Sequence, residues 1–268
     1  MNIKFGCCGS TINSDIDKIG INIIEALKKI GFDYIELSLR DIAQLSNRDF
    51  LLLKKRIYLS GLKCEVCNNF YPENIKLTGL DTNNDTILRY LEKALFRAKQ
   101  IGVEVIVLGS PFSKNLPDGF SGEKAWGQMI EKLRLINLAV KKNKITVVIE
   151  PINRNESNFI IKTKEAYQLV KEVGRENIQL LVDYYHFSLE EEDPKILLEI
   201  NGLLKHVHFS RIKNRSFPIK IEEDPNYLPF ISNLKGIGYQ HRVSIEAYTD
   251  NFINDATKSL RFLKNSFS

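Results

Sequence analysis

The sequence predicts a closed (β/α)8 barrel, an α/β fold in which eight parallel strands alternate with eight helices. Short apolar runs rich in β-branched residues alternate with amphipathic segments, and each kind occurs eight times. The chain has 268 residues, close to the ~250 that such barrels typically need. An open sheet would also alternate in this way, but no Gly-x-Gly-x-x-Gly follows the first strand, which disfavours a dinucleotide-binding fold. No proline-rich or low-complexity stretch divides the chain, so we expect a single barrel domain over residues 1–268.

The predicted elements follow from these two patterns. Strands are expected over 3–8, 34–38, 63–68, 103–109, 146–151, 178–183, 204–209 and 242–247. Helices are expected over about 14–30, 46–60, 85–101, 123–143, 163–173, 193–200, 226–236 and 255–266. Candidate helix N-caps are Ser14 or Asp15, Asp85, Ser121 and Thr163, and candidate terminating glycines are Gly31, Gly61, Gly102, Gly174 and Gly202.

Composition and charge indicate an ordinary soluble globular protein, with 43% apolar and 26% charged residues. The 38 Lys and Arg exceed the 33 Asp and Glu by 38 − 33 = 5, an excess too small to indicate a nucleic-acid partner. No apolar run approaches the ~20 residues of a membrane helix. The N-terminus, MNIKFGCCGSTINSD, turns polar too early for a secretory signal, so we expect a cytoplasmic protein.

The four cysteines are expected to be small buried hydrophobic residues. Cys64 and Cys67 form a Cys-x-x-Cys, but it lies at a strand end and not in a knuckle turn. Cys7 and Cys8 are adjacent on a strand and would point to opposite faces. The four thiols therefore do not easily form one metal site.

Polar residues stand at the ends of four consecutive predicted strands. Glu150 ends the fifth strand, Asp183 the sixth, His208 lies near the end of the seventh, and Glu246 lies near the end of the eighth. In a barrel these ends meet at the mouth, where active sites are found. The longest loops, 68–84, 109–122, 151–162 and 209–225, crowd the same face.

These four residues predict a metal site. A single carboxylate at a strand end is often only a helix cap, and a lone histidine is often a core residue, but four independent caps need not fall at equivalent strand ends. Three carboxylates and one imidazole form a hard, oxygen-rich set that suits Mn2+, Mg2+ or Co2+ more than a structural zinc. His206 is expected one layer deeper on the same face, and His241 on the surface.

The sequence resembles the xylose isomerase-like barrels, the sugar (phosphate) isomerase/epimerase superfamily, and within it the D-tagatose/D-psicose 3-epimerases. The resemblance spans nearly the whole chain. It is carried by EPINRNESNFIIKT (150–163), DYYHFSLEEEDP (183–194), HVHFSRIKNRSFP (206–218) and RVSIEAYTD (242–250).

The resemblance implies a (β/α)8 TIM barrel with one divalent metal ion, Mn2+ before Mg2+ or Co2+. It implies that the acid/base pair is Glu150 and Glu246, which are also metal ligands together with Asp183 and His208. It further implies that substrate is bound by Glu156, His186 and Arg215.

Two departures from the family pattern concern the substrate. One extra residue separates His208 from Arg215, so Arg211 is an alternative to Arg215. The loop GSPFSKNLPDGF (109–120) lacks the tryptophan that floors the ketose pocket in the 3-epimerases, and Trp126 lies too far into the next helix to replace it.

The implied chemistry is proton transfer next to a carbonyl through a cis-enediolate, by two carboxylates on opposite faces. The function expected first is a metal-dependent sugar epimerase or isomerase similar to the ketose 3-epimerases, with a small-molecule sugar as substrate. The alternative with the same residues is a lyase or dehydratase acting on a keto-sugar or keto-inositol. Less favoured are an apurinic endonuclease, whose extra histidines are replaced here by Asn68 and Gly109, and a non-catalytic sugar-binding barrel.

The sequence leaves several properties open. It does not name the sugar, the reaction outcome or the metal, nor show whether the substrate is phosphorylated. Relatives commonly form dimers or tetramers, so a homo-oligomer stays open. A phosphate would need a basic cradle, for which the candidates are Lys114, Arg211, Lys213 and Arg215.

Overall fold

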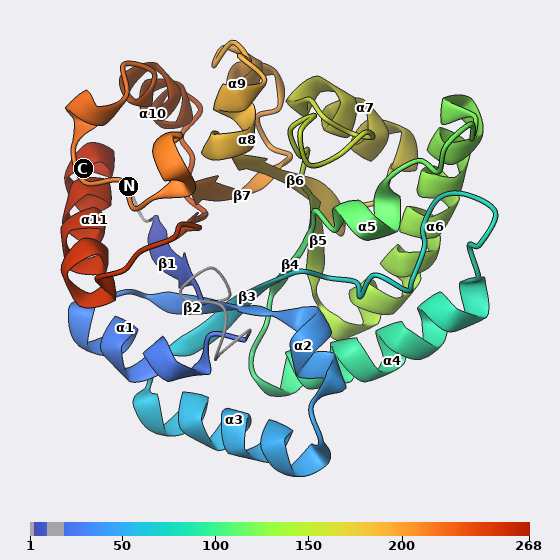
Figure 1. The fold of residues 1–268 in the computed structure, drawn as a ribbon, viewed down its shortest axis with the longest axis horizontal. Helices are drawn as coiled ribbons and strands as arrows, with labels where there is room; N and C mark the ends of the chain where they lie inside the picture. The colour runs from blue at the N-terminus through green and yellow to red at the C-terminus, as the bar shows by residue number, and fades with distance from the viewer. Residues whose placement is uncertain (1–2, 10–18) are drawn as a thin grey trace.

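The structure is a computed structural model that describes residues 3–9 and 19–268 (Figure 1). Eight strands form a closed barrel in the order β1 to β8, and β8 pairs in parallel with β1 to complete the ring. The strands are β1 Lys4–Cys8, β2 Tyr34–Ser38, β3 Lys63–Asn68, β4 Val105–Leu108, β5 Thr146–Ile149, β6 Ile178–Asp183, β7 Leu204–Phe209 and β8 Arg242–Ile245. The predicted fold class is therefore confirmed, and the predicted strand positions agree to within two residues at each end.

Helices surround the barrel on its outer side (Figure 1). Those that were predicted are α1 Ile24–Ile30, α3 Asn47–Ser60, α4 Asn84–Gln100, α6 Gly122–Asn143, α7 Thr163–Val173, α9 Ile196–Glu199, α10 Tyr227–Gly236 and α11 Phe252–Phe267. Short helices that were not predicted are α2 Leu39–Gln44, α5 Pro111–Lys114 and α8 Tyr184–Leu189, with 3-10 turns η2 Lys213–Arg215 and η3 Ile221–Glu223. The 3-10 turn η1 Ile21–Ile23 precedes α1 within the helix predicted over about 14–30, of which residues 14–18 lie outside the described part of the chain. Each of α2, α5 and α8 begins within three residues of a strand's carboxyl end, where a single turn carries too little periodicity to be recognised. No described helix is long and apolar enough to cross a membrane.

The helix ends test the capping predictions. Ser121 caps α6 as expected, because its side chain accepts a hydrogen bond from the backbone N–H of Lys124. Asp85 is not the cap of α4: Asn83 precedes it and accepts from the N–H of Thr86 at 2.9 Å. Ser14 and Asp15 lie outside the described residues.

The prediction that Thr163 caps α7 is also wrong. Lys162 holds the N-cap position, and Thr163 is the first helical residue. The N–H of Thr163 donates instead to Glu192, 2.9 Å away, so a carboxylate from a neighbouring loop replaces the local cap. The terminating glycines were predicted correctly, since all five have positive φ: Gly31, Gly61, Gly102, Gly174 and Gly202.

Alternation along the strands separates two apolar layers. One face of each strand joins the large core beneath the helices, as Ile35 and Ile106 do. The other face points into the barrel, where a smaller cluster forms from Tyr34, Val66, Val105, Val107, Val148 and Leu181. Side chains two positions apart on a strand point to the same face, so a residue two positions after a member of the inner cluster also points into the barrel. Where that residue stands at the carboxyl end of its strand, its side chain lies at the mouth of the barrel.

The amino end of the barrel is closed by ion pairs. Glu65 is buried on β3, and its carboxylate accepts from Lys4 Nζ at 2.7 Å and from Arg242 Nε at 2.7 Å. Arg242 also pairs with Glu104. Two cations from β1 and β8 therefore compensate a buried carboxylate that would otherwise carry a large desolvation cost.

The cysteine predictions are confirmed for burial. All four cysteines are buried and none of them forms a disulfide. Burial raises the pKa of Cys8 well above its ordinary value, as expected for an inert core thiol.

Gly6 is required by the inner layer of the barrel, and its replacement tests this packing. A Cβ added at Gly6 would lie 2.2 Å from Cε2 of the buried Tyr34 ring. We expect Gly6→Ala to lower the free energy of unfolding by about 1–3 kcal/mol, the usual cost of overpacking a core. Urea denaturation measures this change. Gly127→Ala is the matched control, because nothing lies within 4 Å of its added Cβ; equal loss in both variants would contradict the packing argument.

Candidate active site

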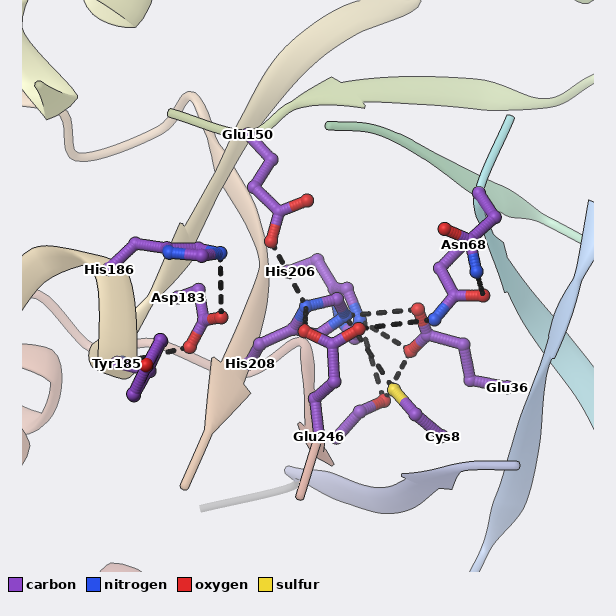
Figure 2. A network of polar contacts seen from close by, with 12 residues as sticks. Cys8, Glu36, Asn68, Glu150, Asp183, Tyr185, His186, His206, His208 and Glu246 are labelled. Carbon is purple, nitrogen blue, oxygen red and sulfur yellow. Dashed lines mark hydrogen bonds and ion pairs between the residues drawn. The ribbon is translucent and has the colours of Figure 1, made fainter. Parts of the chain in front are cut away.

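The four predicted metal ligands lie together at the mouth of the barrel (Figure 2). Glu150 follows β5, Asp183 ends β6, His208 lies on β7 and Glu246 follows β8. Each stands two residues after a residue that faces the barrel interior, for example Val148 before Glu150. One possible ligand atom from each residue lies within 4.8 Å of those of the other three.

His208 provides the observation that tests whether this set fits a cation. Its Nδ1 lies 3.1 Å from Glu246 Oε2 and 3.4 Å from Glu150 Oε1. The atom is buried and makes no hydrogen bond within the described part of the chain. An unpartnered imidazole nitrogen among three carboxylates is a hard donor set, and the buried cluster could hold a divalent metal ion.

The electrostatics of the carboxylates agree with this fit. Burial raises the pKa of Glu150 and of Asp183. Burial also opposes ionisation of Glu246, but the nearby His208 and Arg215 hold its pKa below the ordinary range. The protein's own cations thus compensate only part of the negative charge, and a bound cation would favour ionisation of all three.

Arg215, not Arg211, faces the site. Its Nη2 lies 2.7 Å from Asp183 Oδ2 and 2.5 Å from Glu246 Oε2, and its guanidinium stacks 4.7 Å above the centre of the Tyr185 ring. Arg211 is turned toward Glu223, 3.6 Å away. The backbone of Arg215 has positive φ, so the loop after β7 is bent sharply to bring this side chain inward.

Glu156 and His186 lie on the neighbouring wall and are joined by Asn153. The amide of Asn153 donates to Glu156 Oε1 at 2.9 Å and lies 2.6 Å from His186 Nδ1. This places the ring proton of His186 on Nε2, which lies 3.6 Å from Asp183 Oδ2. Burial lowers the pKa of His186, so the neutral ring presents an N–H donor toward the mouth.

A cavity of about 210 Å3 opens between these groups. This is smaller than the ~300–1,000 Å3 of sites for drug-sized ligands and suits a small molecule. Tyr71 Oη and Arg215 Nε are buried without a hydrogen-bond partner among the described residues. The lining is mostly polar and consists of Arg40, Asn68, Asn69, Tyr71, Gly109, Ser110, Pro111, Phe112, Ser113, Glu150, Ile152, Glu156, His186, Arg215 and Glu246.

Of two expectations about residues after β4, the one for Lys114 is wrong and the one for Trp126 is confirmed. Lys114 was a candidate for a phosphate cradle, but it is buried and donates to the backbone carbonyls of Glu150 and Ile160 at 3.1 and 3.3 Å, so that suggestion is wrong. Trp126 lines a different hollow and donates to Glu172, as its position suggested. The aromatic residue that the fourth loop contributes to the cavity is Phe112.

Besides Asn153 and Tyr185, two polar residues that contact the predicted ligands were not identified from the sequence. Asn68 ends β3 and donates its amide to Glu246 Oε1 at 3.2 Å. Glu36 lies on β2 and contacts both His206 and His208 (Figure 2). The sequence did contain a signal for Glu36: it is a carboxylate within the apolar run YIELS, which is fully buried in the structure. It stands two residues after Tyr34 and so shares its face of the strand. His206 lies one layer below His208, as predicted, and His241 is exposed.

Gly109 leaves room for Glu150. A Cβ added at Gly109 would lie 2.2 Å from Glu150 Oε2 and 3.2 Å from its carboxyl carbon. The end of β4 is therefore kept free of side chain at the place where the Glu150 carboxylate lies.

Comparison with known proteins agrees with this architecture. The family model of the xylose isomerase-like TIM barrel matches residues 24–266. The chain belongs to this family. The resemblance inferred from the sequence motifs is thereby confirmed.

Several curated relatives are sugar epimerases. The chain is 27% identical over 234 residues to a probable ketose 3-epimerase of Synechocystis sp., covering 84% of this chain and 77% of the relative. It is 26% identical over 207 residues to the D-psicose 3-epimerase of Agrobacterium fabrum, covering 74% and 69%. These relatives support the prediction of a carbohydrate epimerase or isomerase.

Solved structures share the fold. The D-allulose 3-epimerase from Methylomonas sp., crystallised in complex with D-allulose, superposes with a TM-score of 0.85. The match covers 99% of this chain and 97% of that one, at 20% sequence identity.

Removal of a ligand tests the metal site. We expect Asp183→Ala and His208→Ala to lose bound Mn2+, because the remaining donors no longer fill the coordination shell. Calorimetric titration and elemental analysis measure the loss. His241→Ala, which removes an exposed histidine, is the control and should bind Mn2+ as the wild type does. Unchanged Mn2+ affinity in both Asp183→Ala and His208→Ala would exclude a metal site formed by these four residues.

Proposed function

We propose that the protein is a divalent-metal-dependent sugar epimerase or isomerase of the ketose 3-epimerase type. The observation that carries the proposal is the placement of Glu150 and Glu246. They approach His208 from opposite sides, at 3.4 and 3.1 Å, beside a small polar cavity (Figure 2). Two carboxylates on opposite sides of one site match a reaction that removes a proton on one face and returns it on the other.

The proposed ligands of one divalent ion are Glu150, Asp183, His208 and Glu246, with Mn2+ first and Mg2+ or Co2+ as alternatives. When bound, the ion would supply electrophilic stabilisation of the negative charge that develops on the substrate oxygens. The site residues then have to hold the sugar, keep one glutamate ionised as the base and one protonated as the acid, and move the proton.

The proton steps fall to the two glutamates. A carboxylate oxygen of one removes the proton from the carbon next to the carbonyl, leaving a planar cis-enediolate of the substrate. The other glutamate, which is protonated at the start of the cycle, delivers its proton to the opposite face, so the configuration at that carbon is inverted. The two glutamates then have exchanged protonation states, and exchange with solvent resets them. Asn68 and Arg215 both bind Glu246, which fixes the direction in which its carboxylate points.

The sugar hydroxyls require donors and acceptors along the cavity. His186 Nε2–H, the Glu156 carboxylate and Arg215 are proposed to bind them, as in the family pattern. Asn153 aligns the first two, and Tyr185 supports the guanidinium of the third. The unpartnered Tyr71 Oη and Arg215 Nε supply further polar atoms beside the cavity, which suits a polyol more than an apolar ligand.

Replacing each glutamate by glutamine tests the proton transfer. We expect Glu150→Gln and Glu246→Gln each to reduce turnover by roughly 10²–10⁴-fold, because the amide keeps the size of the side chain but removes the base. The assay is proton NMR of Mg2+-loaded protein with a panel of ketoses in D2O, where deuterium marks the exchanging carbon. Glu199→Gln, an exposed carboxylate on α9, is the control.

Either outcome of this assay is informative. Wild-type turnover in one of the two glutamine variants would contradict the two-carboxylate proposal. Mass spectrometry of the product separates the reaction classes, since an epimer or isomer keeps the substrate mass and a dehydratase product is lighter by one water. A lighter product would support the lyase alternative.

Arg215 is expected to act on substrate rather than as a ligand. We expect Arg215→Ala to raise KM or lower kcat by about 10- to 100-fold, as loss of a charge-assisted hydrogen bond of ~1.5–3 kcal/mol implies. Bound Mn2+ should be retained. Arg211→Ala, which removes the guanidinium paired with Glu223, should have wild-type kinetics. The reverse result would assign the role to Arg211.

A further inference from the structure

Glu36 is a fully buried carboxylate that contacts the site from below and is absent from the ligand set. Its Oε1 lies 2.9 Å from His208 Nε2, and its Oε2 lies 3.0 Å from His206 Nε2. The hydroxyl of Ser244 donates to the same Oε2 at 2.7 Å. Figure 2 shows Glu36 reaching the two imidazoles from the side opposite Glu150 and Asp183.

We propose that Glu36 is a positioning residue that accepts the Nε2 proton of His208 and so leaves the Nδ1 lone pair facing the three carboxylate ligands. The inference rests on the proposed function, because it concerns the same cation site.

The tautomer follows from the neighbours of the His208 ring. A neutral imidazole carries one N–H, and a carboxylate can only accept. With the proton on Nε2, the ring donates to Glu36, and Nδ1 is free to bind a cation. With the proton on Nδ1, the Nε2 lone pair would face the Glu36 carboxylate at 2.9 Å in a site with no exposure to water. That arrangement is repulsive, so Glu36 selects the tautomer that can act as a ligand.

A bond to a carboxylate also makes the imidazole a stronger ligand. Histidines that bind metals generally donate their second ring N–H to a carboxylate or carbonyl, which fixes the ring and raises its basicity. Here the fixed ring has its free Nδ1 3.1 Å from Glu246 Oε2 and 3.4 Å from Glu150 Oε1. The bond to Glu36 therefore controls both the direction and the strength of this donor.

Glu36 is itself oriented by a chain of hydrogen bonds. Tyr34 Oη lies 2.8 Å from Ser244 Oγ, which donates to Glu36. These contacts cross the barrel interior from β2 to β8, and His206 binds the same carboxylate oxygen from β7. Since both oxygens of Glu36 have partners, the carboxylate has little freedom to turn away from His208.

Three variants separate positioning of His208 from support of the fold. Glu36→Leu removes the acceptor, and Glu36→Gln keeps an amide oxygen that can accept but removes the charge. Tyr34→Phe is the matched control: it deletes a hydroxyl at the far end of the same network, where Tyr34 Oη bonds Ser244 and not His208. The measurements are the Mn2+ dissociation constant by calorimetry and the melting midpoint of the metal-free protein.

Loss of a residue that hydrogen-bonds a metal-binding histidine typically weakens metal binding by about 10- to 100-fold. We expect Glu36→Leu to raise the Mn2+ dissociation constant by an amount near the upper end of this range, and Glu36→Gln by an amount near its lower end. Tyr34→Phe should lower the melting midpoint, because the buried oxygen of Ser244 loses its bond to Tyr34 Oη. It should leave the dissociation constant within about twofold, because Ser244 and His206 still bind Oε2 of Glu36 and the carboxylate keeps its place beside His208. In Mg2+-loaded wild type, NMR should show a His208 Nε2–H protected from solvent exchange, and Glu36→Leu should lose this protection.

Failure of the inference is distinguishable from failure of the proposed function. If wild type binds Mn2+ and Glu36→Leu binds it equally well, the positioning role is wrong while the cation site stands. If Glu36→Leu does not fold, unchanged affinity in Glu36→Gln overturns the role. If wild type binds no Mn2+, the cation site is wrong and the role of Glu36 falls with it.

Discussion

Three carboxylates at the mouth of one barrel must be neutralised, and much of the site is arranged around this requirement. Glu150 and Asp183 are buried, and the side chain of Glu246 is only 12% exposed. The positive groups that reach them before a cation binds are Arg215, from the loop behind β7, and the protonated form of His208, which the neighbouring carboxylates favour. The neutral ring of His208 is the form that binds a cation. Burial still raises the pKa of Glu150 and Asp183, which is the physical reason why this cluster could hold a divalent cation.

The same requirement explains the construction of the loop after β5. Lys114 is buried behind Glu150 and holds its backbone carbonyl at 3.1 Å, and burial lowers the pKa of this lysine to about 7. Farther along, Arg154 pairs with Glu190 at 2.7 Å. Contacts on both sides of the loop thus fix Glu150 on the barrel and Glu156 above it. Fixed surroundings of this kind hold a carboxylate in one direction, and little reorganisation is then needed during the proton transfer proposed for Glu150.

Buried charged groups are paired to different extents at the two ends of the barrel. At the amino end, Glu65 is fully compensated by Lys4 and Arg242, so that cluster is closed and serves stability. At the mouth, His208 Nδ1 and Arg215 Nε have no hydrogen-bond partner among the described residues, and a polar cavity adjoins them. The polar groups at the mouth are thus only partly paired, whereas the Glu65 carboxylate at the amino end is fully paired. This difference agrees with the usual division of these barrels into a catalytic face and a stabilising face.

Local pattern determined the barrel and its four central residues. The repeat of apolar runs and amphipathic segments predicts parallel strands, and the period of two along each strand puts Glu150, Asp183, His208 and Glu246 on the inner side at the carboxyl ends. These properties are short-range, so the sequence alone could supply them. The caps of α4 and α7 differ from the prediction because Asn83 accepts from the first turn of α4, and because the N–H of Thr163 donates to Glu192, which is 29 positions away in the sequence.

Only the tertiary structure decided which side chains meet across the barrel. The contact of Glu36 with His208 joins residues 172 positions apart, and it depends on how two non-adjacent strands face each other across the interior. Likewise, the turn after β7 directs Arg215 toward Asp183 and Arg211 toward Glu223, although both arginines stand in the same loop. The sequence determined the strands and the residues at their ends, because these follow from local periodicity. Barrel closure and loop rotation decided their partners, because these depend on backbone geometry that no local pattern encodes.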